Sequence, residues 1–393
     1  MRGTKQEALA AGMAGSDQGI DAALAAWLRG GAMPDALARA PRDALLLRID
    51  LHGLGPTLAR MAEGAPDDLS AALRDRLVAR EFWEAQHARI LAEALDALAA
   101  AGLHPLVMKG SALAHSIYPS PAERMRGDSD VLVEPEGREA AAAAMEAAGF
   151  AAPQDAGGAI LVGEALYQKA DPTGVVHDID LHWRFSNAAF QARLYTHAEL
   201  AARARPIAVG RATARRPEDV DALLLACVHR VSHVGGTGHI TLNGVPHPVI
   251  DSLTWLRDLD LLARRLDPEA WDRFWTRADA RDVAEICAKG LLDAHAALGT
   301  PIPADAVAAH AARPPGPMAT YLRLSPLRRL WWDLGAAPGA AGKLRFLADL
   351  GLPPPDYMRA RFGRDGRGWL PWLYLKRAAG GLHAAYRRGR ARR

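Results

Sequence analysis

The stretch PLVMKGSALAHSIYPSPAERMRGDSDVLV, residues 105–133, decides the fold because it interrupts an otherwise helical pattern. Residues 105–109 form a short apolar run that predicts a buried strand, and residues 110–118 continue with the spacing of a short helix. Residues 129–133 predict a second strand, after which residues 137–150 show helical periodicity. These elements indicate a core of mixed α and β structure.

Further strands are expected after this stretch, and helices on both sides of it. Residues 159–170 and 174–185 predict two strands joined by a turn, and residues 206–214 predict a short β segment. Residues 69–102 predict a long helix that ends at a glycine, and helical patterns dominate after residue 216. We therefore expect an α+β fold, with a small mixed sheet flanked by helices and a mostly helical C-terminal domain.

At 393 residues the chain exceeds one ordinary core, so two or three compact units are expected. The changes in pattern predict a disordered N-terminus over 1–17, a helical N-terminal region over 18–102, an α/β core over 103–215, a helical domain over 216–312, and a helical C-terminal region with prolines, tryptophans and a basic tail over 313–393. The motifs that carry chemistry lie in the α/β core.

Carboxylates on two of the predicted strands are the candidate metal ligands. Alternate side chains of a strand share a face, so Asp128 and Asp130 are expected to point the same way. In the run HDIDLHW, the same alternation lets an adjacent strand bring Asp180 to the same place, with Asp178 as the runner-up. Carboxylates bind magnesium ions, so we predict Asp128, Asp130 and Asp180 as metal ligands and catalytic residues. His182 is a further candidate on the same face as Asp180.

Candidate phosphate-binding residues lie beside these carboxylates. Gly110 permits close approach of a ligand to the backbone, and Ser111 adds a hydroxyl donor at the start of the short helix. Lys109, Arg124 and Arg126 supply positive charge that could neutralise phosphates, and Arg126 is favoured because it lies two residues before Asp128. Each motif alone is more often a helix cap or a polar turn, but their order along the chain favours a site for nucleotide and metal.

This order resembles the nucleotidyltransferase superfamily of the DNA polymerase β type, with Gly-Ser, then Asp-x-Asp, then a single carboxylate on a later strand. More closely, the chain resembles the bacterial uncharacterised nucleotidyltransferase family. The shared motifs are Lys109-Gly110, Ile117-Tyr118-Pro119, an arginine shortly before Asp-x-Asp, the strand from Asp180 to Trp183, and a helix ending in His229 and His233. The resemblance covers about residues 85 to 300.

The resemblance implies a nucleotidyltransferase core with a helical C-terminal domain. It implies that Asp128, Asp130 and Asp180 bind metal, and that Gly110 and Ser111 bind the triphosphate. The expected reaction is Mg²⁺-dependent transfer of a nucleoside monophosphate from a nucleoside triphosphate such as ATP, with Mn²⁺ as an alternative ion. The acceptor is a hydroxyl or similar group of a small molecule, peptide or protein. The sequence leaves the acceptor, the nucleotide and the oligomeric state open.

Two other functions remain as alternatives. Asp-x-Asp also occurs in metal-dependent glycosyltransferases that use a sugar nucleotide, although those enzymes place several βα units before the motif. A non-catalytic nucleotide-binding regulatory module would keep the fold without turnover. His229 and His233 are four residues apart on a predicted helix, a spacing that also suits zinc with Asp251, although structural histidines are favoured; His229 is a further candidate residue of the cleft.

The composition excludes several other classes. The net charge is only +3, with 48 basic and 45 acidic residues. The chain therefore lacks the strong overall positive charge that is typical of a nucleic-acid-binding protein. The two cysteines, Cys227 and Cys287, suit a reducing compartment in which neither needs a partner. The first residues do not have the pattern expected of a signal peptide, and the sequence has no run of about 20 apolar residues. We expect a cytoplasmic protein without a membrane span.

Overall fold

The computed structural model describes most of the chain: residues 17–152, 163–234, 239–242, 244–353, 355–363, 367–377 and 379–380. The predicted disordered N-terminus lies outside the described residues except for Asp17, which begins a helix over residues 17–28. The basic tail also lies outside them. The chain divides into two compact units, the first made of residues 1–95, 106–130 and 200–324, and the second made of residues 96–105, 131–199 and 325–393.

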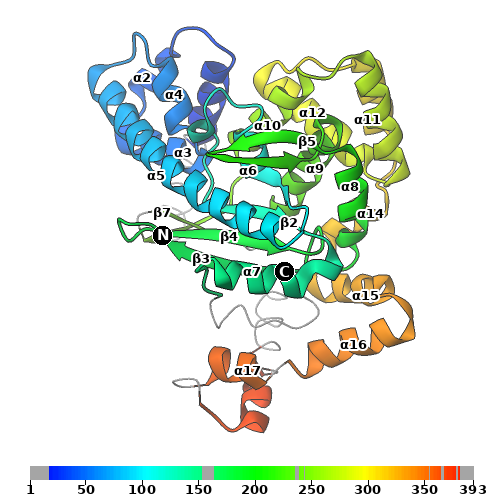
Figure 1. The fold of residues 1–393 in the computed structure, drawn as a ribbon. Coiled ribbons are helices and arrows are strands. Elements are labelled where there is room, and N and C mark those ends of the chain that lie inside the picture. Colours follow the sequence, from blue (N-terminus) through cyan, green and yellow to red (C-terminus); the bar gives the residue numbers. More distant parts are fainter. Residues whose placement is uncertain are drawn as a thin grey trace, which may run out of the picture. The chain divides into compact units, whose positions relative to one another are not determined.

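A six-stranded sheet with flanking helices organises the fold (Figure 1). Its strands are β1 Leu106–Val107, β2 Asp128–Leu132, β3 Glu164–Ala170, β4 Val176–His182, β5 Arg205–Val209 and β6 Ala212–Arg216, in the order β3-β4-β2-β1-β6-β5. β3 with β4 and β5 with β6 are antiparallel pairs, whereas β1 and β6 are parallel. The sheet is therefore mixed, which confirms the predicted α+β class.

The strand β2 belongs to both compact units, since the division falls between Asp130 and Val131. On its first-unit side, the Met108 amide donates to the Asp130 carbonyl over 2.9 Å. On its second-unit side, the Val133 amide donates to the His182 carbonyl of β4 over 2.8 Å.

The elements around the central motifs follow the sequence pattern closely. The long helix α5 spans Asp67–Ala100, and Gly102 after it takes the left-handed conformation, φ +78°, as expected for a glycine that ends a helix. The helix α6 spans Lys109–Ala114, and α7 spans Arg138–Ala147. The predicted order of strand, helix, strand and helix is therefore confirmed, with β1, α6 and α7 shorter than predicted and β2 of the predicted length.

The turn between β3 and β4 explains their register. Asp171 Oδ1 accepts hydrogen bonds from the amides of Thr173 and Val175, over 2.8 and 3.1 Å, and so closes the turn. The resulting register places Leu166 opposite Asp180. Along β4, Ile179 and Leu181 are buried while Asp180 is half-buried, as strand alternation predicts.

Helices make up most of the rest of the first unit. They are α2 Asp35–Arg39, α3 Arg42–His52, α4 Gly55–Met61, α9 Asp219–His233, α10 Leu253–Ala263, α11 Pro268–Ala280, α12 Ala284–Leu298, α13 Ala304–Ala311 and α14 Pro317–Arg323. The helices α9, α10 and α12 pack on one another (Figure 1). Cys227 and Cys287 are buried as free thiols in this packing. The short helix α8 spans His197–Arg203, and the division of the chain between the two units falls within it.

The second unit contains α7, β3, β4 and the C-terminal helices. These helices are α15 Pro326–Ala336, α16 Gly339–Gly351 and α17 Pro355–Phe362. Asp333 of α15 accepts a hydrogen bond from the Phe190 amide over 2.8 Å, and Trp332 packs edge-on against the Phe190 ring at 4.9 Å. These contacts fix α15 to the segment that follows β4.

One segment after residue 216, where helical patterns dominate the sequence, forms strands instead. Residues 234–247 have the composition of a glycine-rich loop, but part of them forms a two-stranded hairpin of β7 His239–Leu242 and β8 Val245–Pro248. Gly244 adopts the positive φ of +78° that a tight hairpin turn needs. The alternation of Ile240 and Leu242 with polar residues was the available signal, and the glycines around it obscured it.

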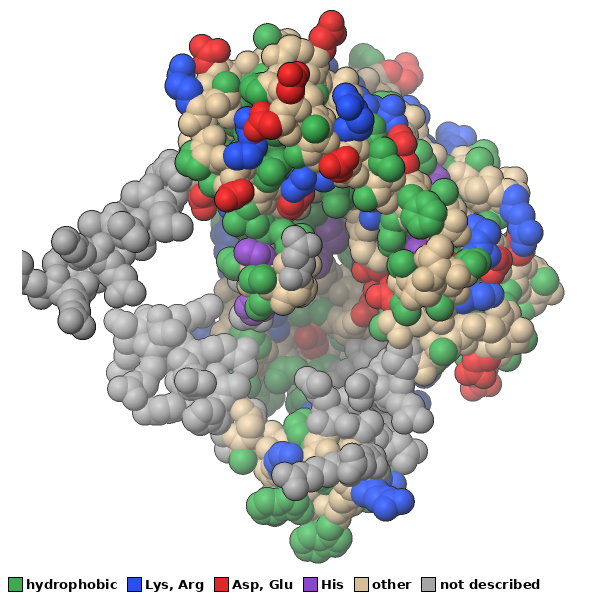
Figure 2. Space-filling model, turned by 90° about the vertical axis from the view of Figure 1, so that its left-hand side faces the viewer, with side chains coloured by type: hydrophobic (Ala, Val, Ile, Leu, Met, Phe, Trp, Pro, Cys, Tyr) green, Lys and Arg blue, Asp and Glu red, His purple; other side chains and the backbone are tan. Residues whose placement is uncertain are grey.

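The surface agrees with the near balance of charges. Figure 2 shows basic and acidic side chains intermixed on one face of the molecule. Among the helices of the described residues, none combines the length and the apolar character that a bilayer crossing requires.

Candidate functional site

Lys109 and Asp130 form the centre of the candidate site in the first unit. Lys109 follows β1 and has a left-handed backbone, φ +47°, which a residue with a side chain seldom adopts. Its Nζ lies 2.5 Å from Oδ1 of Asp130, which is buried on β2. The structure thus joins the Lys-Gly-Ser and Asp-Ser-Asp motifs through an ion pair between one residue of each.

A chain of buried hydroxyls joins the same two motifs behind this ion pair. Ser111 Oγ and Ser129 Oγ lie 2.7 Å apart, and Ser129 Oγ lies 2.6 Å from Nε2 of His87 on α5. The His87 ring is fully buried and stacks on Trp83 at 4.2 Å. Ser111, a predicted phosphate ligand, is itself 1% exposed. In this structure its hydroxyl supports β2 from within the core.

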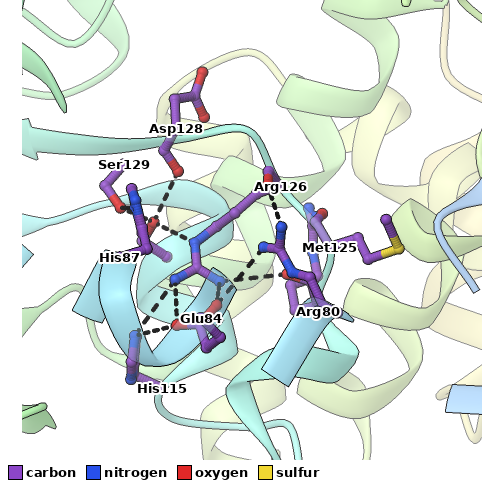
Figure 3. Close-up of polar contacts among 10 residues, drawn as sticks. Arg80, Glu84, His87, His115, Met125, Arg126, Asp128 and Ser129 are labelled. Atoms are coloured by element: carbon purple, nitrogen blue, oxygen red, sulfur yellow. Dashed lines mark hydrogen bonds and ion pairs between the residues drawn. The ribbon is translucent and has the colours of Figure 1, made fainter. Parts of the chain in front are cut away.

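Arg126 extends this network to a buried acidic residue (Figure 3). Its Nε donates to Ser111 Oγ over 2.8 Å, and its two terminal nitrogens donate to the two carboxylate oxygens of Glu84 over 2.9 and 2.8 Å. His115 Nε2 lies 3.3 Å from the same carboxylate, and Arg80 donates to the Arg126 carbonyl over 2.8 Å. The guanidinium of Arg126 therefore holds the loop that leads into β2.

The charges in this cluster act strongly on one another. Burial tends to raise the pKa of Glu84, but the hydrogen bond from His115 and the charges of Arg126 and Arg80 outweigh it and lower that pKa to about 2. Burial and the neighbouring charge of Arg126 lower the pKa of Arg80 to about 9. At neutral pH the cluster thus holds an ionised carboxylate among cationic groups.

The other predicted phosphate ligands lie nearby. Arg124 is buried, and its guanidinium donates to both oxygens of Asp258 on α10, with Nε to Oδ1 and a terminal nitrogen to Oδ2 at 2.8 Å each. Tyr118 donates to the same carboxylate over 2.7 Å. A Cβ added to Gly110 would lie 3.6 Å from the Arg124 guanidinium, so this arginine packs directly over the glycine backbone. Binding of phosphate by Arg124 or Arg126 stays a prediction, and it would require these hydrogen bonds to be exchanged.

The second-unit candidates lie on β4. Asp178 Oδ1 accepts a hydrogen bond over 2.8 Å from Gln168, the residue opposite it on β3. His182 is buried, and its Nδ1 lies 3.1 Å from Glu164, which is also its opposite neighbour. The neighbours on β3 thus orient the residues on either side of Asp180.

Three of the predicted residues meet along β2 and β4, which are neighbours in the sheet. One ligand atom each from Asp130, Asp180 and His182 lies within 4.8 Å of the others, and among the described residues these form a group that could hold a metal ion. Asp128 lies outside this group; it is exposed at the start of β2, and its carboxylate points away from the Glu84 cluster in Figure 3. Its role as a ligand stays a prediction.

The histidines of α9 lie close together without forming a metal group with Asp251. The rings of His229 and His233 are 4.3 Å apart. Asp251 instead accepts a hydrogen bond from Arg230 Nε over 2.8 Å, and these three residues form no metal-binding group in the described part of the chain. Burial, the neighbouring His233 and the charge of Lys109 lower the pKa of His229 to about 3, so its ring is neutral at physiological pH.

Sequence reasoning missed the residues that support the site from α5 and α10. Glu84 and His87 are three residues apart on α5, a spacing that places both on one helix face. Polar residues on a helix usually indicate a solvent-exposed face. No sequence pattern predicts that Glu84 contacts Arg126 or that His87 contacts Ser129, some forty residues later. The same holds for Asp258, which neutralises Arg124 from α10.

A family model and a solved structure match parts of the chain. A family model described as "Uncharacterised nucleotidyltransferase" matches residues 41–299. Among solved structures, the chain is similar to an antigenic nucleotidyltransferase-like protein from Paracoccidioides brasiliensis, with 14% identity over 56% of this chain and 96% of that chain and a TM-score of 0.36. No curated protein matches the chain.

Proposed function

Since the chain belongs to the uncharacterised nucleotidyltransferase family, we propose that it transfers a nucleoside monophosphate from a nucleoside triphosphate to an acceptor hydroxyl. The observation that carries this proposal is the convergence of Asp130, Asp180 and His182 on neighbouring strands, beside Lys109. The order of Gly-Ser, Asp-x-Asp and a later strand carboxylate also supports the proposal that the family is bacterial and belongs to the nucleotidyltransferase superfamily of the DNA polymerase β type. ATP is the proposed donor, and the acceptor is a small molecule, peptide or protein.

The residues present fit a divalent cation. Two carboxylates offer the oxygen ligands that Mg²⁺ prefers, and an imidazole beside them also suits Mn²⁺. We propose that Asp130 and Asp180 hold the ion and that Asp128 contributes a further carboxylate. When bound, such an ion would neutralise charge on the triphosphate and lower the pKa of the acceptor hydroxyl.

The chain's own residues would then support attack of the acceptor oxygen on the α-phosphorus. Asp180 would accept the proton of the hydroxyl as the new oxygen–phosphorus bond forms and pyrophosphate leaves. The Lys109 ammonium, already 2.5 Å from Asp130, is the cation best placed to donate to a phosphate oxygen. Gly110 and Ser111 are proposed to lie beside the same phosphates.

The proposal is tested with two aspartates of one strand. Asp178 and Asp180 are both half-buried on β4, but only Asp180 belongs to the candidate metal group. Wild type, Asp180→Asn and Asp178→Asn are incubated with cell extract, Mg²⁺ and each of the four α-³²P-labelled triphosphates. Wild type and Asp178→Asn are expected to label an acceptor, and Asp180→Asn is expected to lose the labelling.

The same assay separates the alternatives. Equal labelling by wild type and Asp180→Asn would contradict the assigned role of Asp180. Binding of uridine diphosphate sugars without binding of any triphosphate would favour a glycosyltransferase. Binding of Mg²⁺ and triphosphate without a labelled product would favour a regulatory module.

A further inference from the structure

Three aromatic side chains of the first unit form a cluster that the proposed chemistry does not use. The rings of His229 and His233 on α9 are 4.3 Å apart, and the ring of Trp255 on α10 lies 5.9 and 5.8 Å from them. We call these three rings the aromatic platform. His233 is exposed, while His229 and Trp255 are half-buried, so the platform reaches the surface.

The platform lies beside the centre of the candidate site. The helix α9 packs against α6, the helix that begins with Lys109. Both imidazoles are close enough to Lys109 and Asp130 for the charges of these residues to act on their pKa values. The platform and the Lys109–Asp130 pair therefore belong to one region of the first unit.

The two imidazoles of the platform differ from other histidines in their polar contacts. Within the described residues, neither ring of His229 and His233 makes a hydrogen bond or an ion pair with a side chain or backbone group. By contrast, His52, His87 and His177 each have a polar partner. The exposed imidazole of His233, which has no polar partner among the described residues, therefore leaves its ring nitrogens available to a ligand, and the half-buried His229 lies directly behind it.

We propose that the aromatic platform binds the nucleobase of the donor triphosphate. This inference rests on the proposed function, because it takes the phosphates to lie at Lys109 and Asp130. The base of a nucleotide is separated from its α-phosphate by one ribose, so it must lie in the region next to the phosphate site. Every base offers a flat π face, and stacking on aromatic side chains is the common way to hold it. The platform supplies such faces in that region.

Binding measurements with a ligand that lacks a base test this proposal. Isothermal titration calorimetry in Mg²⁺ compares each nucleoside triphosphate with inorganic tripolyphosphate, for wild type, His233→Ala, His233→Phe and His104→Ala. His104 is the control, since it is an exposed histidine whose imidazole lies against the Glu134 carboxylate. His233→Ala is expected to weaken triphosphate binding by about fivefold or more and to leave tripolyphosphate binding unchanged. His233→Phe is expected to restore triphosphate binding, and His104→Ala to match wild type.

The outcomes separate this inference from the proposed function. Wild type that binds triphosphates and tripolyphosphate equally well, or a His233→Ala variant that weakens both ligands alike, would overturn the platform and leave the transfer reaction standing. Wild type that binds neither ligand would overturn the proposed function and the platform with it. Circular dichroism of His233→Ala, expected to match wild type, shows that any loss of binding is not a loss of folding.

Discussion

Lys109 combines an unfavourable backbone with a useful side chain. A left-handed backbone costs a residue with a Cβ roughly 1–2 kcal/mol relative to glycine. The structure retains lysine there, φ +47°, with its ammonium on Asp130. Lys109 has this strained backbone and pairs with Asp130, a candidate metal ligand. The strain therefore supports a functional role for the Lys109 side chain.

Two substitutions at Lys109 separate backbone from charge. Lys109→Gly and Lys109→Ala both remove the ion pair with Asp130, but only glycine relieves the left-handed backbone. Lys109→Gly is therefore expected to be more stable than Lys109→Ala by about 1 kcal/mol, measured by urea unfolding. Equal stability of the two variants would contradict the strained backbone.

The backbone conformation of Lys109 could not be predicted from the sequence. Gly110 was expected to let a ligand approach the backbone closely, and no unusual φ was assigned to Lys109 before it. The structure places a positive φ at Lys109, where the long-range ion pair with Asp130 accompanies it. A contact between positions 109 and 130 is a tertiary fact that no local propensity encodes.

At the scale of elements, α5 supports the loop before β2 through Glu84. Because the folded pKa of Glu84, about 2, lies below its ordinary value of 4.5, its ionised form stabilises the fold. This contribution is complete above about pH 4.5 and is lost as the pH falls toward 2. Removing the charge also leaves Arg126 and Arg80 without their carboxylate.

Glu84→Gln is therefore expected to destabilise the protein in a pH-dependent way. At pH 7 the loss is about 3 kcal/mol in the free energy of unfolding, and it shrinks between pH 4.5 and pH 2. Urea unfolding at several pH values measures it. Glu93→Gln is the control on the same helix, because Glu93 pairs with the more exposed Arg89 and should cost less than about 1 kcal/mol. A pH-independent difference for Glu84→Gln would contradict the assigned charge state.

The elements and the β3–β4 pair were largely predictable, whereas contacts between residues far apart in the sequence were not. The apolar runs of residues 105–109 and 129–133 gave β1 and β2 because short buried strands leave a clear local pattern. The hairpin of β7 and β8 was missed because its strands are short and surrounded by glycine. The alternation in HDIDLHW predicted the faces of β4, but the hydrogen bond that engages Asp178 depends on Gln168 across the pair.

At the scale of the whole molecule, the two units are built from interleaved segments. The parallel neighbour of β1 is β6, so Leu106 lies opposite Arg215, more than a hundred residues later. The first unit gathers three separate segments and the second unit three others. The sequence pattern predicts consecutive regions of similar secondary structure. The compact units instead depend on contacts between segments that are far apart in the sequence.

Because segments of the two units alternate along the chain, the units could unfold together or separately. A substitution of Asp333, which lies in the second unit, distinguishes these two cases. Asp333→Ala removes the acceptor of the Phe190 amide in the second unit, so exchange of that amide and of residues 191–194 is expected to accelerate about fivefold or more. Amides of α6, in the first unit, are expected to keep their wild-type rates. Hydrogen exchange followed by mass spectrometry measures both segments in one sample. Equal acceleration in α6 would mean that the two units open as one, because a local loss of one hydrogen bond would then have reached the candidate site.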